Sequence, residues 1–251
     1  MTNTAAAKTL STISTNAAWV AMGATLTYQV LLGALIFLRP DLDPSWHSIS
    51  EWAIGPHRWI MSCAFLVSSV SYACLFVMLR TELGKPMGRI GLGILLICAI
   101  GAAGAGIFTT DPMPFRNPLS TRGTLHVICG TIQLVLFPFA ALLIGLSLAR
   151  ANQIWARACR LLIRSAWLPL FGFVGFATYT SLFVVPMGPR AYGPGVNIGW
   201  PPRFAFFTYT LWILIVGSQA IKCCHLRSEE GHLHDELRDC LPSAKALSQP
   251  Q

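Results

Sequence analysis

The sequence predicts an all-α membrane protein with six transmembrane helices in one bundle. Of its 251 residues, 54% are hydrophobic and only 11% are charged, whereas soluble domains carry about 25% charged residues. The mean hydropathy of +0.57 is concentrated in six separate apolar runs, each about long enough to cross a hydrocarbon core ~30 Å thick at ~1.5 Å per residue. Because a backbone in lipid must satisfy its own hydrogen bonds, such runs fold as helices.

The chain divides into one membrane domain and two tails. Residues 1–16 are rich in Ser, Thr and Ala, so we expect a disordered N-terminal tail. The first apolar run is too long for the core of a signal peptide and is expected to be a retained span. The six expected spans cover residues 17–38, 59–79, 90–109, 124–149, 165–186 and 204–221, and residues 222–251 form a C-terminal tail. Without an internal repeat, residues 17–221 are predicted to be a single domain.

Two spans carry residues that affect helix packing. The third contains Gly101, Gly104 and Gly106, which leave room for a neighbouring backbone to approach closely. The fourth contains Pro138, where a kink is expected.

The basic residues predict the orientation in a cell membrane. If both termini are cytoplasmic, the inner segments hold 12 Lys and Arg residues and the outer connections hold 6, as the positive-inside rule favours. These residues lie at the ends of apolar runs and form no single basic face, so the expected partner is membrane lipid and not nucleic acid. Three polar connections then lie on one outer face.

The first outer connection is the densest in reactive groups. Residues 44–56 contain a histidine, three serines and a carboxylate. Ser48 and Glu51 match a capping box, and Ser48 and Ser50 are more typical of helix caps than of nucleophiles. We therefore expect Ser50 to contact substrate, with Glu51 as the candidate for catalysis.

Three acid–base residues could meet on the outer face. Glu51, Asp111 and His126 are the candidate catalytic residues, with a carboxylate acting as general base on a water. His126 stands out because an ionisable side chain near the start of a span is a functional hypothesis by default. The alternatives stay open: His126 could be a neutral imidazole bonded to a backbone carbonyl, and the carboxylates could be satisfied by Arg116, Arg122 or Arg203.

The same residue types allow a metal and an anionic substrate. His126, Asp111 and His47 are suitable ligands for zinc, whose bound water has a pKa of about 7 in catalytic sites. Arg203 and Arg190, in a glycine-rich connection, could grip a lipid phosphate together with Ser50; salt bridges between loops are the alternative.

Four motifs resemble a bacterial and archaeal integral membrane family catalogued as domain of unknown function 998. They are Ser48–Glu51 followed by Gly55 and Pro56, Gly106–Asp111, Gly123–His126 with Gly130, and Gly199–Arg203. The likeness covers about residues 17–221 and implies a six-span bundle without a settled activity. Where that family often ends in Gly-x-Glu-Arg, this chain reads Gly-Trp-Pro-Pro-Arg, so only the role of Arg203 is carried over.

The chain is also distantly similar to the alkaline ceramidase and progestin-receptor superfamily. The likeness consists of a Ser, an Asp at a span end and a His near the start of another span. It implies zinc-dependent amide hydrolysis. That superfamily has seven spans and two histidine ligands in a late span, whereas the fifth and sixth spans here contain no histidine.

Two functional hypotheses follow. The first is an enzyme that hydrolyses or transfers a group on a lipid-like substrate at the outer face. The second is a non-enzymatic scaffold, lipid-binding protein or small transporter. Ion-coupled transport is disfavoured because the span centres offer only Gln133, hydroxyls, Pro138 and glycines.

Overall fold

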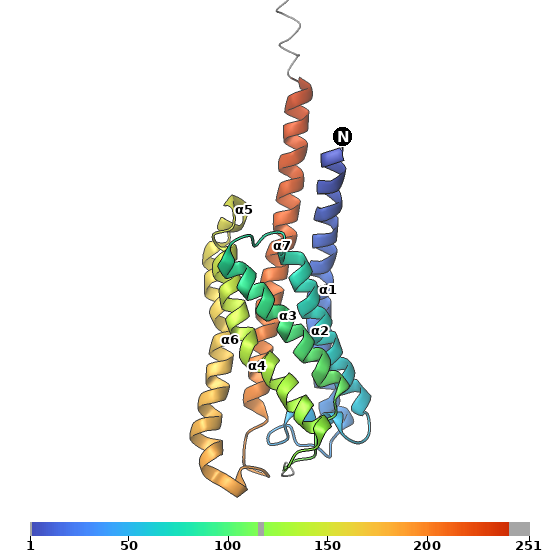
Figure 1. Ribbon diagram of the computed structural model, residues 1–251, viewed down its shortest axis with the longest axis vertical. Coiled ribbons are helices and arrows are strands. Elements are labelled where there is room, and N and C mark those ends of the chain that lie inside the picture. The colour runs from blue at the N-terminus through green and yellow to red at the C-terminus, as the bar shows by residue number, and fades with distance from the viewer. Residues whose placement is uncertain (1, 115–117, 241–251) are drawn as a thin grey trace, which may run out of the picture.

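The computed structural model describes residues 2–114 and 118–240. Within them the chain is helical and contains no strand (Figure 1). The elements are α1 (Thr2–Leu38), the 3₁₀-helix η1 (Ile49–Ala53), α2 (Arg58–Leu79), α3 (Pro86–Ile107), α4 (Thr121–Leu148), α5 (Gln153–Ala156), α6 (Cys159–Tyr179), the π-helical turn η2 (Thr180–Val184), the 3₁₀ segment η3 (Val185–Arg190) and α7 (Trp200–Cys240).

Six helices are long and apolar enough to cross a membrane, as the sequence predicts. They cover Ser14–Leu38, Arg58–Leu79, Pro86–Ile107, Thr121–Leu148, Cys159–Gly188 and Trp200–Glu229. The prediction of a multi-pass helical membrane protein is confirmed. The orientation of the two termini relative to the cytoplasm stays a prediction.

The first and last helices extend beyond their expected boundaries. Helix α1 begins at Thr2, where a disordered tail was expected, because an Ala-rich segment that continues an existing helix avoids the cost of nucleation. Helix α7 runs on to Cys240, well past the expected end of the last span.

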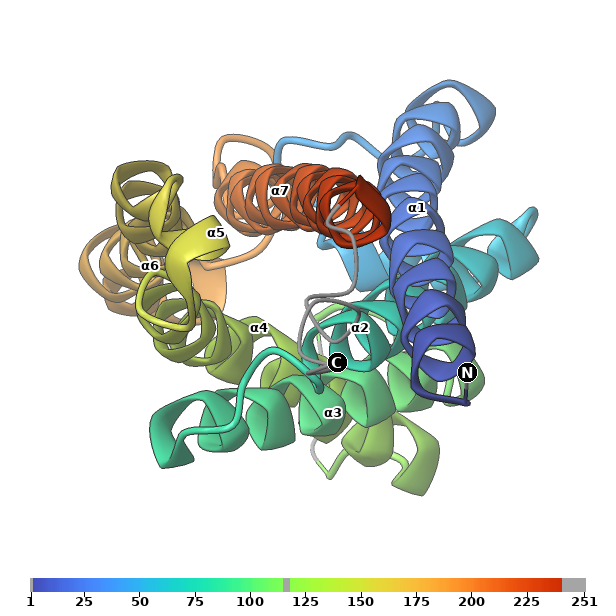
Figure 2. The same cartoon turned by 90° about the horizontal axis from the view of Figure 1, so that it is seen from above.

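The six long helices form a closed ring. Each packs on the next in the order α1, α2, α3, α4, α6 and α7, and α7 returns to α1 (Figure 2). Helices α4 and α7 are not neighbours in this order and contact each other less than adjacent helices do. Close packing of α3 depends on its glycines: a Cβ on Gly101 or Gly104 would collide with Cys129 of α4, and one on Gly106 with α2. The predicted role of these glycines is confirmed.

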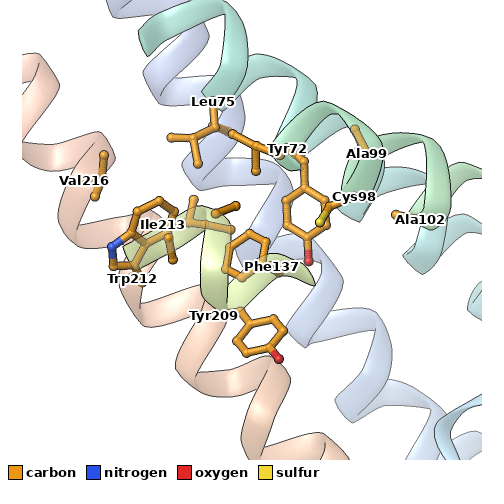
Figure 3. Packing of buried hydrophobic residues seen from close by; sticks show 14 of the residues in the cluster. Tyr72, Leu75, Cys98, Ala99, Ala102, Phe137, Tyr209, Trp212, Ile213 and Val216 are labelled. Carbon is orange, nitrogen blue, oxygen red and sulfur yellow. The ribbon is translucent and has the colours of Figure 1, made fainter. Parts of the chain in front are cut away.

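Aromatic side chains fill the centre of the ring. The ring of Phe137 stacks on Tyr209, with centroids 4.7 Å apart, and lies 4.9 Å from Tyr72 and 5.6 Å from Trp212 (Figure 3). Pro138 lies inside α4 beside this cluster. The cluster joins α2, α4 and α7 and forms a closely packed apolar layer beneath the polar end of the bundle.

The three polar connections gather at one end of the bundle. Residues 39–57, 108–114, 118–120 and 191–199 lie at the lower end in Figure 1, opposite the N-terminal end of α1. We call this the loop end. These connections lie on one side, as predicted, because consecutive spans run in opposite directions and every second connection therefore falls at the same end.

Candidate functional site

The 3₁₀-helix η1 carries the buried Glu51 at the loop end. Its carboxylate accepts the backbone N–H of Ser48 at 2.6 Å and the phenol of Tyr192 at 2.5 Å. Burial, together with the hydrogen bond to Glu51, raises the pKa of Tyr192 above its usual value. Glu51 thus joins η1 to the connection that precedes α7, in addition to its predicted capping role.

Ser50, the neighbour of Glu51, contacts His126 of α4. The Nε2 atom of His126 lies 2.9 Å from the Ser50 hydroxyl, and Nδ1 lies 2.8 Å from the carbonyl oxygen of Phe108. A carbonyl can only accept, so Nδ1 carries the proton and Nε2 accepts the Ser50 hydroxyl proton. The ring of Phe65 packs edge-on against this imidazole at 5.7 Å. This is the relation of a nucleophile to its general base.

A cavity of about 300 Å³ opens beside this pair. Its volume lies at the lower end of the range for small-molecule sites. Ser50 and His126 line its polar side, and α2, α4, α6 and α7 supply apolar walls. The apolar lining includes Phe65, Val127, Leu134, Phe176, Ile198 and Phe206. The arrangement can hold an apolar chain with its polar end at a hydroxyl and an imidazole.

Glu51 and Asp111 do not line this cavity. The expectation that both would share it with His126 is therefore corrected. The Asp111 carboxylate accepts the backbone N–H and the hydroxyl of Ser120, each at 2.7 Å, and the Ser120 hydroxyl accepts the N–H of Gly123. Asp111 thus supports the N-terminus of α4, because the first N–H groups of a helix need acceptors.

Arg203 holds the first connection against α7. Its Nη1 donates to the carbonyl oxygens of Pro44 and His47, each at 3.1 Å, and to that of Gly199. The guanidinium lies 4.3 Å from the centroid of the Trp52 ring, a cation–π distance. These contacts assign Arg203 to loop packing. Arg190, the other proposed substrate residue, and Arg116 have side chains outside the described residues.

The proposed metal ligands are not grouped. His47 is buried, with Nδ1 3.0 Å from the carbonyl oxygen of Asp43 and its ring 3.6 Å from that of Trp46. Both ring nitrogens of His126 have protein partners, and Asp111 serves Ser120. Among the residues whose side chains the structure describes (14–114, 118–188 and 191–229), no three His, Cys, Asp or Glu residues could hold a metal ion. The proposed zinc set of His126, Asp111 and His47 does not fit this geometry.

Sequence reasoning missed two partners in the site. Tyr192 was not among the candidate site residues, and Gln133 was considered only as a polar residue in a span. Gln133 lines the cavity, and its position seven residues after His126, which is two helical turns, is the signal that could have found it.

Fold and site together define a multi-pass helical membrane protein with a polar pair at the mouth of an apolar cavity. The model of the family described as protein of unknown function (DUF998) matches residues 20–219. The chain belongs to this family. No curated protein and no solved structure matches it, and the likeness to the alkaline ceramidase and progestin-receptor superfamily is not supported.

Proposed function

We propose that this protein is a membrane-embedded serine hydrolase or acyltransferase that acts on a lipid-like ester. One observation carries the proposal: the Ser50 hydroxyl, His126 and the Phe108 carbonyl form a continuous hydrogen-bonded series beside an apolar cavity. The cavity suits an acyl chain, and the hydroxyl lies where the chain's carbonyl would meet it.

The reaction needs only these groups and a second nucleophile. Ser50 Oγ attacks the acyl carbonyl carbon while His126 Nε2 takes the hydroxyl proton. The ester C–O bond then breaks, His126 returns the proton to the leaving alcohol, and the acyl group remains on Ser50. Water or an acceptor alcohol, deprotonated by His126, then attacks the acyl carbonyl carbon. The bond to Ser50 Oγ breaks, His126 returns the proton to this oxygen, and a carboxylic acid or a new ester leaves.

The partner of Nδ1 affects the expected rate. A backbone carbonyl fixes the tautomer of His126 as an aspartate would, but it stabilises the imidazolium less because it carries no full charge. We therefore expect slow turnover and a serine that is nonetheless more reactive than other serines of the chain.

Labelling with an alkyl fluorophosphonate tests the proposal in purified protein. The probe should modify Ser50, as located by peptide mass spectrometry, and modification should fall at least ~100-fold in Ser50→Ala and in His126→Gln, as expected when a general base is lost. Ser218→Ala is the matched control, because Ser218 bonds only the carbonyl of Ile215 on α7.

Thermal unfolding of each variant separates lost chemistry from lost folding. If folded wild-type protein is not labelled at Ser50, or if folded His126→Gln is labelled as fast as wild type, the hydrogen bond is structural and the enzyme proposal is wrong. A folded, unreactive protein that retains lipid in the cavity would support the lipid-binding alternative instead.

A further inference from the structure

Gln133 is a buried polar residue that the chemistry of Ser50 and His126 does not use. It lies near the middle of α4, is 1% exposed and lines the cavity. Its carboxamide nitrogen has no hydrogen-bond partner among the described residues. An amide without a partner in a membrane interior is costly, and lipid chains offer no acceptor for it.

The position of Gln133 relative to His126 is fixed by the helix. Seven residues separate them, so both lie on the same face of α4, about 10 Å apart at ~1.5 Å per residue. Gly130 lies between them, also lines the cavity, and has nothing within 4 Å of the position of a Cβ. An open wall therefore runs from the Ser50 hydroxyl to the part of α4 that carries Gln133. The carboxamide nitrogen is itself buried, so it must turn toward the cavity to meet a chain that lies along this wall.

We propose that Gln133 is a specificity-determining residue. In this proposal the cavity takes an acyl chain that carries an oxygen acceptor about 10 Å from its reacting carbonyl, which is the length of two helical turns. A hydroxyl, ether or carbonyl oxygen would accept the free N–H of the carboxamide. The inference rests on the proposed function for the position of the reacting carbonyl. A plain hydrocarbon chain fits the same walls but leaves the amide unsatisfied.

A scan of oxygen position along one chain tests this inference. The probes are the p-nitrophenyl ester of dodecanoic acid and its analogues in which a single methylene is replaced by an ether oxygen, at successive positions. Two readouts are compared: kcat/KM of the wild-type protein, and binding of the same esters to Ser50→Ala, which cannot form the acyl-serine. One oxygen position should exceed the plain chain by about tenfold in both readouts.

Gln133→Leu should remove that preference because it keeps the side-chain volume and loses the donor. Gln29→Leu is the matched control: Gln29 donates to Thr210 on α7 and does not line the cavity. The control also corrects for the weaker partitioning of ether-containing chains into detergent.

The outcomes separate the two proposals. One outcome is that ester binding to Ser50→Ala depends on the oxygen position, that Gln133→Leu removes this dependence, and that the wild-type protein cleaves no ester. This outcome would support the role of Gln133 and reject the hydrolase. Cleavage with no preferred oxygen position, or a preference that survives Gln133→Leu, would overturn the role of Gln133 alone.

Discussion

Two groups of polar side chains, one at the end of the bundle opposite the loop end and one in the cavity, differ in how far their hydrogen-bonding groups are satisfied. At the end where α1 begins and α7 ends, the Glu82 carboxylate accepts N–H groups from both Nη atoms of Arg227 at 2.6 and 2.7 Å and from the indole of Trp155 at 2.8 Å. The cavity contains Gln133 from the middle of α4, whose carboxamide nitrogen has no partner among the described residues. The first cluster is complete by itself, while the second leaves room and a donor for another molecule.

The difference indicates which cluster stabilises the fold and which is available for binding. In a charge-assisted cluster in which every group is paired, replacing any one member leaves its partners unpaired and lowers the stability of the fold. A cavity with an unsatisfied amide costs stability unless something fills it. Substitutions at the Glu82 cluster should therefore lower stability, and substitutions in the cavity should lower reactivity at unchanged stability.

The largest effect is expected for Glu82→Ala. It leaves the buried indole of Trp155 without an acceptor and Arg227 without its bidentate partner, so the free energy of unfolding should fall by about 2–3 kcal/mol. Thermal unfolding in detergent measures this, and the exposed Glu229→Ala should change it little. Unchanged stability of Glu82→Ala would mean that the cluster does not stabilise the bundle.

The same cluster predicts a dependence on pH. Burial opposes ionisation of Glu82, but hydrogen bonds from Arg227, Trp155 and Asn152 outweigh it and lower its pKa below the usual value of 4.5. A lowered carboxyl pKa stabilises the folded state above the unfolded pKa, and this contribution disappears as pH falls through the folded pKa. The stability difference between wild type and Glu82→Gln should therefore shrink below about pH 4.5.

Asp111→Ala should come next, at about 2 kcal/mol, because Ser120 loses both acceptors and the N-terminus of α4 frays. Stability should fall while fluorophosphonate labelling per folded molecule persists. Asp43→Ala is the control, since the Asp43 side chain is exposed and its carboxylate accepts hydrogen bonds from the exposed turn at Ser45. If folded Asp111→Ala is not labelled, Asp111 takes part in the chemistry, as expected from the sequence.

Gly130→Leu should have the opposite effect of Asp111→Ala: it should slow labelling of Ser50 and leave stability unchanged. The added side chain meets no atom within 4 Å of its Cβ, so the fold should accept it, but it enters the cavity. We expect labelling of Ser50 to slow about tenfold, or ~1.4 kcal/mol in activation free energy, at an unchanged melting temperature. Gly93→Leu, on the exposed face of α3, should leave labelling unaltered; equal slowing in both variants would argue against a substrate in this cavity.

The smallest effect is expected for Tyr192→Phe. It removes one of the two hydrogen bonds to the buried Glu51 carboxylate and should lower stability by about 1 kcal/mol. Tyr179→Phe, a ring that stacks on Phe183, is the comparison. If the two variants have the same melting temperature, the hydrogen bond from Tyr192 to Glu51 does not stabilise the connection before α7, which Arg203 and the backbone hydrogen bond from Gly199 to Ser45 also hold.

The spans could be predicted from sequence because each signal is local. About twenty apolar residues between polar connections identify a membrane helix without reference to any partner. The glycines of α3 were also predictable, since small residues inside a span indicate a close neighbour. The start of α1 was missed because its Ala-rich tail has a composition that is compatible with both disorder and helix.

The site could be predicted only in part because its contacts are distant in sequence. The alternative of a His126 imidazole bonded to a backbone carbonyl holds at Nδ1, but the Nε2 partner, Ser50, lies 76 residues away. Asp111 and Glu51 were expected to face the same cavity as His126, yet each has a nearer acceptor role, at a helix end or a loop. Composition identifies reactive side chains but not the direction in which they point.

The hydrogen bond between Glu51 and Tyr192 joins residues 141 positions apart and has a consequence for biosynthesis. Its two partners flank the first and the last spans, so the loop end can close only after α7 has entered the membrane. Until then η1 has no Tyr192 and no Arg203 to hold it. A chain that stalls before its final helix would therefore present an unassembled loop end, which gives membrane quality control a feature by which to recognise it.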